Sequence, residues 1–221
     1  LGCADEAYPA QQVWLGAVAG RFANRIGGAE LVRDGKHWPL DANQPPHCLH
    51  GGREGFHHRI WQIKEQESDR VKLVLLSKAG DQGFPGNLRV TMEYRLEQYD
   101  LVVEFRASTD APTPVSLTSH AYFNLDGGSK GGDVRDHAIS LNADYFLPTD
   151  GSGLPLAIAP VEGPFNLRVA RPIGQDWLSH PQQRQAKGYD HAFLLNGPEQ
   201  GRAAQVVSGD KQLTMEVYTN Q

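Results

Sequence analysis

Four short segments of the chain gather side chains that can bind polar ligands or move protons. They are G-R-F-A-N-R-I-G at 20–27, P-P-H-C-L-H-G-G at 45–52, S-L-T-S-H-A-Y-F-N-L at 116–125 and K-G-Y-D-H-A-F at 187–193. Arginine and asparagine can donate hydrogen bonds to hydroxyl groups or to a carboxylate, and histidine can carry a proton near neutral pH. Aromatic walls combined with amide groups suit a sugar-like ligand, whose ring faces stack while its hydroxyls hydrogen-bond.

Each segment alone also has a simpler interpretation. Asn24 and Arg25 could lie in a surface turn that holds an ion pair. The two glycines after His50 leave room for a ligand, but a loop histidine without function is the commoner outcome. His120 could be buried and bonded to backbone, and Asp190 could form a turn ahead of a strand.

Other kinds of catalytic centre have less support in the sequence. Three further histidines stand near His50, but their spacing matches no zinc motif and no cysteine pair accompanies them: His47, His57 and His58. Ser119 precedes His120 on an expected strand, where neighbours point to opposite faces, so it is poorly placed for a serine–histidine–aspartate triad with Asp190. Glycine-rich nucleotide loops are also missing. We therefore expect no metal and no bound nucleotide.

The composition narrows the class of protein. The 221 residues carry a net charge of -5 without a basic stripe, which argues against a nucleic-acid partner. No apolar run is long enough to span a bilayer, so no membrane partner is expected. Cys3 and Cys48 do not make a disulfide framework. The chain starts without Met or a signal-peptide pattern and stops on a strand-like segment, so we expect both ends to be cut.

The elements that must position these segments are strands. Apolar and polar residues alternate along 88–97 and again along 101–107, which predicts a hairpin. Asp34-Gly35 is a two-residue hairpin signal, and 213–218 alternates as well. Further strands are expected at 59–65, 70–76, 114–120, 137–142, 192–195 and 203–208. Helical patterning is confined to 174–180, and 126–136 reads as a surface loop. The sequence thus predicts an all-β fold of antiparallel strands, as a sandwich or barrel, in one domain over 1–221.

The order and spacing of the segments resemble the aldose 1-epimerase (galactose mutarotase) family, in particular its bacterial galactose-operon type. The shared motifs are G-R-F-A-N-R-I, L-H-G-G, D-Q-G-F-P-G-N-L, S-H-A-Y-F-N-L, G-Y-D-H-A-F and V-Y-T-N-Q, from about residue 2 to residue 221. The resemblance implies a large antiparallel β-sandwich, the supersandwich, with a sugar in an open cleft on one sheet. It also implies a cytoplasmic enzyme acting on free galactose or glucose, as a monomer or homodimer and without a cofactor.

The resemblance also implies roles for single residues. His120 would be the general acid, and His50 would hold and polarise the region of the ring oxygen. The residues implied in sugar binding are Asn24, Arg25, Asp190 and Gln221. Possible cleft walls without an assigned role are Trp38, Phe56 and Tyr122. The family's base is a glutamate in a later segment, which we expect beyond Gln221.

Two other functions stay open at this point. A hexose-6-phosphate epimerase-like enzyme would need a basic cluster for the phosphate, for which the candidates are Arg21, Arg25 and Arg53. A non-catalytic sugar-binding module is favoured if the glutamate base is absent.

Overall fold

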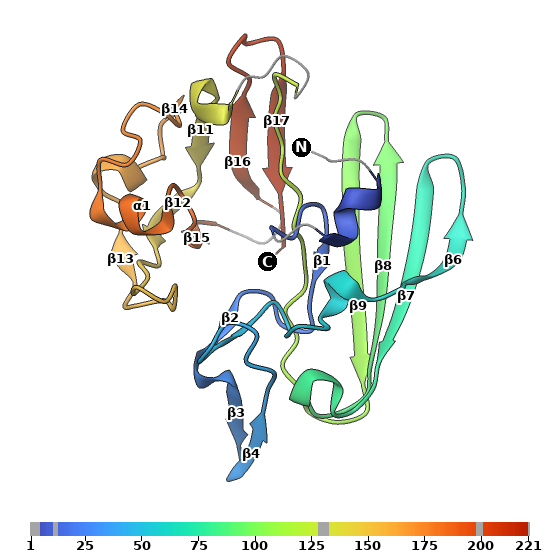
Figure 1. The fold of residues 1–221 in the computed structure, drawn as a ribbon. Coiled ribbons are helices and arrows are strands. Elements are labelled where there is room, and N and C mark those ends of the chain that lie inside the picture. The colour runs from blue at the N-terminus through green and yellow to red at the C-terminus, as the bar shows by residue number, and fades with distance from the viewer. Residues whose placement is uncertain (1–4, 11–12, 128–132, 198–200, 221) are drawn as a thin grey trace. The chain divides into compact units, whose positions relative to one another are not determined.

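The computed structural model describes residues 5–10, 13–127, 133–197 and 201–220 (Figure 1). The chain divides into two compact units, the first over Gly2–Tyr122 and the second over Phe123–Gln221, and each is described by itself. Paired strands make up most of the regular structure, and every pair of named strands is antiparallel. The prediction of an all-β, antiparallel fold is therefore confirmed.

A four-stranded sheet is the largest element of the first unit. Its order is β6 (Gln62–Gln66), β7 (Arg70–Ser77), β8 (Leu88–Glu97) and β9 (Asp100–Thr109). Strand alternation sends Leu88, Val90 and Met92 to the buried face, where each is 0% exposed. The predicted 88–97 strand and its hairpin with the next strand are thus confirmed, with Glu97 paired to Asp100 across the turn.

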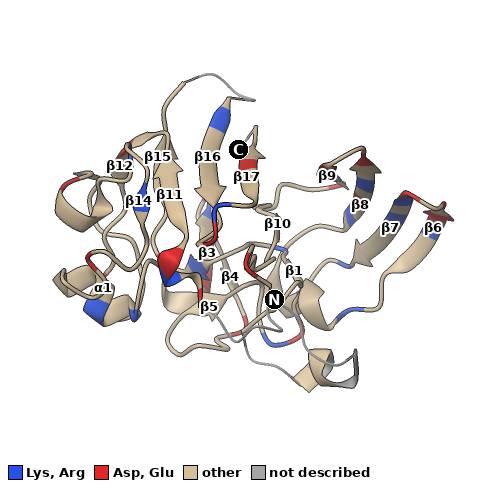
Figure 2. Cartoon of the chain, turned by 90° about the horizontal axis from the view of Figure 1, so that it is seen from above, with Lys and Arg blue, Asp and Glu red and all other residues tan. Residues whose placement is uncertain are grey.

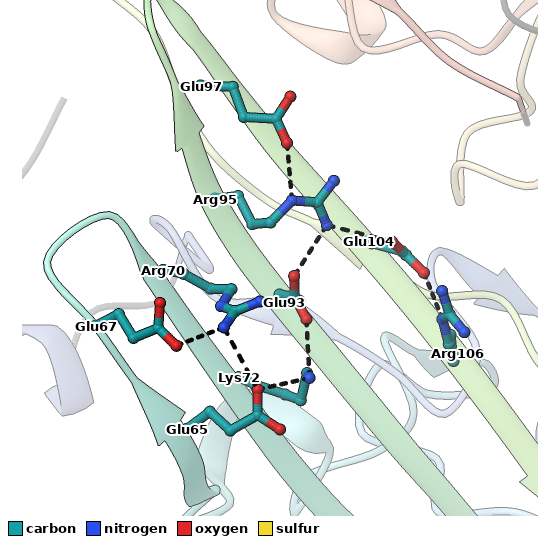
Figure 3. Close-up of polar contacts among 9 residues, drawn as sticks. All are labelled: Glu65, Glu67, Arg70, Lys72, Glu93, Arg95, Glu97, Glu104 and Arg106. Atoms are coloured by element: carbon teal, nitrogen blue, oxygen red, sulfur yellow. Dashed lines mark hydrogen bonds and ion pairs between the residues drawn. The ribbon is translucent and has the colours of Figure 1, made fainter.

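The opposite face of this sheet carries a network of ion pairs (Figure 3). Arg95 bonds Glu93 and Glu97 at 2.9 Å each, and Lys72 contacts Glu65 at 2.8 Å and Glu93 at 3.3 Å. Acidic and basic residues accordingly lie side by side along β6, β7 and β8 (Figure 2). Solvent screens such pairs, so each adds little stability, but charges at the edge strand β6 discourage pairing with another chain.

Three short pairs of strands complete the first unit. They join β1 (Val18–Ala19) to β10 (Thr118–Ser119), β2 (Arg25–Ile26) to β5 (Cys48–Leu49), and β3 (Glu30–Arg33) to β4 (Lys36–Pro39). Its 3-10 helices are η1 (Asp5–Ala10), η2 (Gly27–Ala29), η3 (Phe56–His58) and η4 (Asp81–Gly83). The predicted hairpin at Asp34-Gly35 is confirmed, since both residues have a positive φ, 49° and 72°, as a tight strand-to-strand turn requires.

The second unit holds two small sheets. One has the order β14 (Arg171–Pro172), β11 (Ala138–Leu141), β16 (Arg202–Val207) and β17 (Thr214–Tyr218), and the other β13 (Ala159–Pro160), β12 (Ala143–Phe146) and β15 (Phe193–Leu195). Buried Phe146, Val161 and Phe165 form the core beside the second of these sheets. Short helices are η6 (Val134–Asp136), η7 (Gly163–Phe165) and α1 (Pro181–Ala186).

Two local predictions were wrong. The expected helix at 174–180 is a series of turns, and α1 begins only at Pro181. His180 explains why α1 starts at Pro181. Its Nδ1 accepts the backbone N–H of Gln182 at 3.2 Å, and its backbone N–H donates to Gln183 Oε1 at 3.0 Å. These two bonds form a capping box, which the proline follows. The strand expected at 114–120 forms only over Thr118–Ser119. Of the expected loop at 126–136, residues 128–132 lie outside the described part of the chain.

Arg21 is a buried anchor of the first unit. Only 2% of it is exposed, and its guanidinium donates to the carbonyl oxygens of Pro85 at 2.7 Å and Gly86 at 2.9 Å. It also donates to Ser77 Oγ at 2.7 Å and lies over the ring of Phe84, 5.5 Å from its centroid. The segment that begins at Gly20 is thereby held against the turn between β7 and β8.

The glycine after His50 is required by a close approach of two backbones. Gly51 has a φ of +84°, and a Cβ at this position would lie 2.0 Å from the carbonyl oxygen of Gly20. The L-H-G-G segment can therefore reach the segment that starts at Gly20 only without a side chain here.

Replacing Gly51 with alanine should destabilise the chain strongly. We expect a loss of about 3–5 kcal/mol in the free energy of unfolding, because the backbones must separate as well as tolerate the positive φ. Gly80→Ala is the matched control, since Gly80 has a φ of +83° and nothing within 4 Å of the added Cβ. It should cost only about 1 kcal/mol. Urea unfolding measures both, and equal losses would contradict the close-approach argument.

Candidate active site

The structure brings His50 and His120 together within the first unit. Their ring centroids lie 5.3 Å apart, and the rings meet edge to face at 83°. His50 directly follows β5, and His120 directly follows β10. The two imidazoles come from segments 70 positions apart in the sequence, so only the pairing of short strands can place them side by side.

Backbone bonds fix where each histidine emerges. Asn43 clamps the strand before His50, with its amide nitrogen 2.9 Å from the Leu49 carbonyl and its oxygen 2.7 Å from the Leu49 N–H. The backbone N–H of His120 donates to Ala17 O at 2.8 Å, and its backbone carbonyl accepts the Gly16 N–H at 3.0 Å. Ser119 turns away from this pair and contacts Tyr94, with the two hydroxyl oxygens 3.2 Å apart, as expected of neighbours on a strand.

His50 is held as a neutral imidazole of one tautomer. Its Nδ1 accepts the backbone N–H of Asn24 at 3.0 Å, so the ring hydrogen sits on Nε2. Burial lowers its pKa to about 4, helped by the positive charges that His120, His57 and Arg25 can carry. At neutral pH His50 can therefore donate a hydrogen bond from Nε2 but carries no charge.

Asn24 and Arg25 adjoin this imidazole. Asn24 Oδ1 accepts from the Arg25 backbone N–H at 2.8 Å and from its guanidinium at 3.2 Å. Gln44 Oε1 accepts from Arg25 Nε at 2.7 Å, which orients the guanidinium further. The predicted pair of sugar ligands thus lies beside His50, and Gln44 is a supporting residue that sequence reasoning missed.

Aromatic residues surround the two histidines, and one of them was not foreseen. Trp14 packs against His50 with a centroid distance of 4.7 Å, and Tyr122 packs against His120 at 5.1 Å. Trp14 lies outside the four segments that the sequence singles out, so nothing in the sequence pointed to it. Phe56, expected as a possible cleft wall, is instead 3% exposed within a core cluster.

His57 is a second half-buried histidine near this group. Its ring lies 5.9 Å from that of Trp14, and burial lowers its pKa to about 4, with His58 adding to the effect. It is therefore uncharged at pH 7.

Asp190 and Gln221 keep the status of predictions. Asp190 is an exposed residue of the second unit, between Tyr189, whose hydroxyl donates to Pro164 O at 2.9 Å, and His191. His191 packs against Phe165 at 4.8 Å and contacts Gln182 at 3.2 Å, so it is a structural neighbour. Gln221 lies outside the described residues.

Other reactive centres find little support in the described residues. No group of three or more His, Cys, Asp or Glu among them could hold a metal ion. Burial raises the pKa of the Cys48 thiol to about 11, so it is not a nucleophile at neutral pH. None of the helices in this part of the chain is long and apolar enough to cross a membrane.

Comparison with known proteins places the chain in a family. The family model described as aldose 1-epimerase matches residues 1–221. The chain belongs to the aldose 1-epimerase family. It is 45% identical to the aldose 1-epimerase of Escherichia coli K12 over 99% of this chain and 64% of that protein. It is 38% identical to human galactose mutarotase over 100% of this chain and 64% of that protein.

A solved structure agrees with this family membership. The galactose 1-epimerase of Lactobacillus acidophilus NCFM matches with a TM-score of 0.83 and 31% identity, over 93% of this chain and 61% of that chain. The chain spans just under two thirds of the length of these relatives, 64% in the two curated proteins. The family resemblance drawn from the sequence motifs is therefore confirmed.

The lowered pKa of His50 predicts how stability depends on pH. Because its folded-state pKa of about 4 lies below the ordinary 6.5, the unfolded chain binds more protons between these values. Stability that is present above pH 6.5 should be lost as the pH falls to 4, by about 1–2 kcal/mol after allowance for solvent screening.

The variant His50→Asn keeps an acceptor for the Asn24 N–H but cannot titrate. The pH dependence of urea unfolding should be shallower in this variant between pH 6.5 and 4. An unchanged slope would show that His50 is not held neutral.

Proposed function

We propose that this chain carries the acid side of an aldose 1-epimerase that interconverts the α- and β-anomers of free aldohexoses such as galactose and glucose. The observation that supports this most is the neutral, tautomer-locked His50 facing His120 at 5.3 Å. A cytoplasmic protein acting as a monomer or homodimer, with a monosaccharide as its small-molecule partner, is part of the same proposal.

The reaction explains why two unlike imidazoles are useful. A base removes the proton of the C1 hydroxyl, the bond between C1 and the ring oxygen breaks, C1 becomes an aldehyde carbon, and the ring oxygen takes a proton. After rotation about the C1–C2 bond, the same steps run backward and close the ring on the other face. Each step is a proton transfer or the breaking or forming of the bond between C1 and the ring oxygen, so a base and an acid suffice.

The two histidines divide this work. His50 is neutral at pH 7 because its pKa is about 4. It can therefore donate a hydrogen bond toward the ring oxygen without transferring the proton. His120 is the proton donor of the pair. Each positioned acid or base contributes roughly 10²–10⁴-fold to the rate.

The sugar would be held by Asn24 and Arg25 from the first unit, and Asp190 and Gln221 stay sugar ligands on the family resemblance alone. Arg25 is already oriented by Asn24 and by Gln44, so little side-chain entropy remains to be lost on binding. The family resemblance implies a glutamate as the base, and it matches no glutamate of residues 1–221 to that role.

Polarimetry of α-galactose tests the assignment of acid and base. The 221-residue chain should bind sugar weakly and accelerate mutarotation poorly, because no glutamate of residues 1–221 matches the base that the family resemblance implies. Near-normal rates would show that a residue within the chain serves as base. Binding of galactose without turnover, in this chain and in any longer form of the protein, would favour a sugar-binding module.

In a form of the protein with full activity, His120→Asn should lower kcat more than it raises KM, by at least about 10²-fold in kcat. A larger effect on KM would make His120 a binding residue instead of the acid.

A phosphorylated substrate is less well supported. Of the three arginines considered for a phosphate, Arg21 is buried on backbone carbonyls, and Arg53 pairs with Asp41 at 2.9 Å. Only Arg25 lies beside the histidines. We therefore expect galactose to be converted faster than glucose 6-phosphate. The mutarotation rates of the two sugars, measured under the same conditions, test this. A preference for the phosphate would overturn the assignment.

A further inference from the structure

Trp14 touches more of the histidine cluster than any residue expected from the sequence. Its indole lies 4.7 Å from the ring of His50, 5.9 Å from that of His57 and 6.4 Å from that of His120, centroid to centroid. Against His120 the rings are tilted by only 30°, while against His50 they are tilted by 58°. One side chain thus contacts both members of the pair from different directions.

The backbone around Trp14 is tied to the same histidine. Trp14 has a φ of +52°, and its carbonyl accepts the Ala17 N–H at 3.0 Å, which closes a tight turn. Within that turn Gly16 donates its N–H to His120 O at 3.0 Å. The carbonyl of Val13 accepts the Tyr122 hydroxyl at 3.2 Å. The backbone of 13–17 is therefore bonded to His120 itself and to Tyr122, two residues beyond it, which fixes where the Trp14 side chain starts.

We propose that Trp14 is a positioning residue, which holds the imidazoles of His50 and His120 in their edge-to-face arrangement and shields His50 from water. This inference rests on the proposed function, because it assigns Trp14 to the proton-transfer pair of that reaction. Trp14 itself exchanges no proton.

The electrostatics of His50 agree with this role. Burial is the first cause of its lowered pKa, and the groups that face it, His120, His57 and Arg25, are the further causes. Trp14 is the large apolar side chain in ring contact with it. Without the indole, water would solvate the protonated form of His50, and its pKa would rise toward the ordinary value.

The test combines a titration with kinetics on two variants. Trp14→Leu keeps apolar bulk but removes the ring, and Trp14→Phe keeps a smaller ring. Histidine Cε1–H resonances are followed by NMR against pH, with His50 assigned by its loss in His50→Asn. The midpoint of His50 should rise from about 4 by roughly one unit or more in the leucine variant and by less in the phenylalanine variant. Tyr99→Ala, at a fully exposed hairpin turn, should leave the midpoint unchanged.

In a form of the protein that interconverts anomers, Trp14→Leu should lower kcat about tenfold with a smaller change in KM, and Trp14→Phe should recover most of the loss. A His50 midpoint within about 0.3 unit of the parent in a folded leucine variant would overturn the inference. If the leucine variant does not fold, an unshifted midpoint in the phenylalanine variant would overturn it equally. If no form of the protein, longer forms included, interconverts anomers, the proposed function fails, while the titration of the 221-residue chain still decides the placement of His50.

Discussion

The site in the first unit depends on the burial of one guanidinium. Arg21 gives up its hydration and is repaid by carbonyl oxygens of residues far along the chain, among them Ser77, Pro85 and Gly86. A buried charge left without such partners would cost several kcal/mol. The segment that begins at Gly20 must therefore stay close enough to the turn between β7 and β8 for these hydrogen bonds to form. That constraint sets the carbonyl of Gly20 against Gly51 and so decides where the loop of His50 runs.

The residues that follow Arg21 in the sequence set the tautomer and the charge of His50. Asn24 is three residues past Arg21, and its backbone N–H reaches His50 Nδ1 at 3.0 Å, which selects the tautomer. Arg25 comes next and pairs with Leu49 across the β2–β5 ladder, so its charge stands near His50 and opposes protonation. The G-R-F-A-N-R-I motif thus joins two functions, since one arginine anchors the fold and the other faces the site.

The sequence was sufficient where local chemistry decides the structure. Alternation predicted β8 and β9, and Asp34-Gly35 predicted the turn between β3 and β4, because strand facing and positive φ are local properties. It was insufficient where distant contacts decide. Arg21 was one of three arginines considered for a phosphate, since arginines are rarely buried, and its burial depends on oxygens of Ser77, Pro85 and Gly86, which lie 56 to 65 positions away. Trp14 reaches the histidines only through the β1–β10 pairing, and the start of α1 depends on a cap that outweighs the apolar residues at Trp177 and Leu178.

The hydrogen bond from Asn24 also limits what His50 can do during catalysis. Anomers interconvert in both directions, so the group that protonates the ring oxygen when the ring opens must take that proton back when it closes. His50 Nδ1 is occupied by the Asn24 N–H and Nε2 carries the hydrogen, so accepting a proton would require a charged ring beside His120 and Arg25. The lowered pKa of His50, about 4, agrees with a charged ring being disfavoured there, chiefly through burial. In the reaction proposed above, His50 would therefore stabilise the ring oxygen in both directions, and the proton transfer would fall to His120.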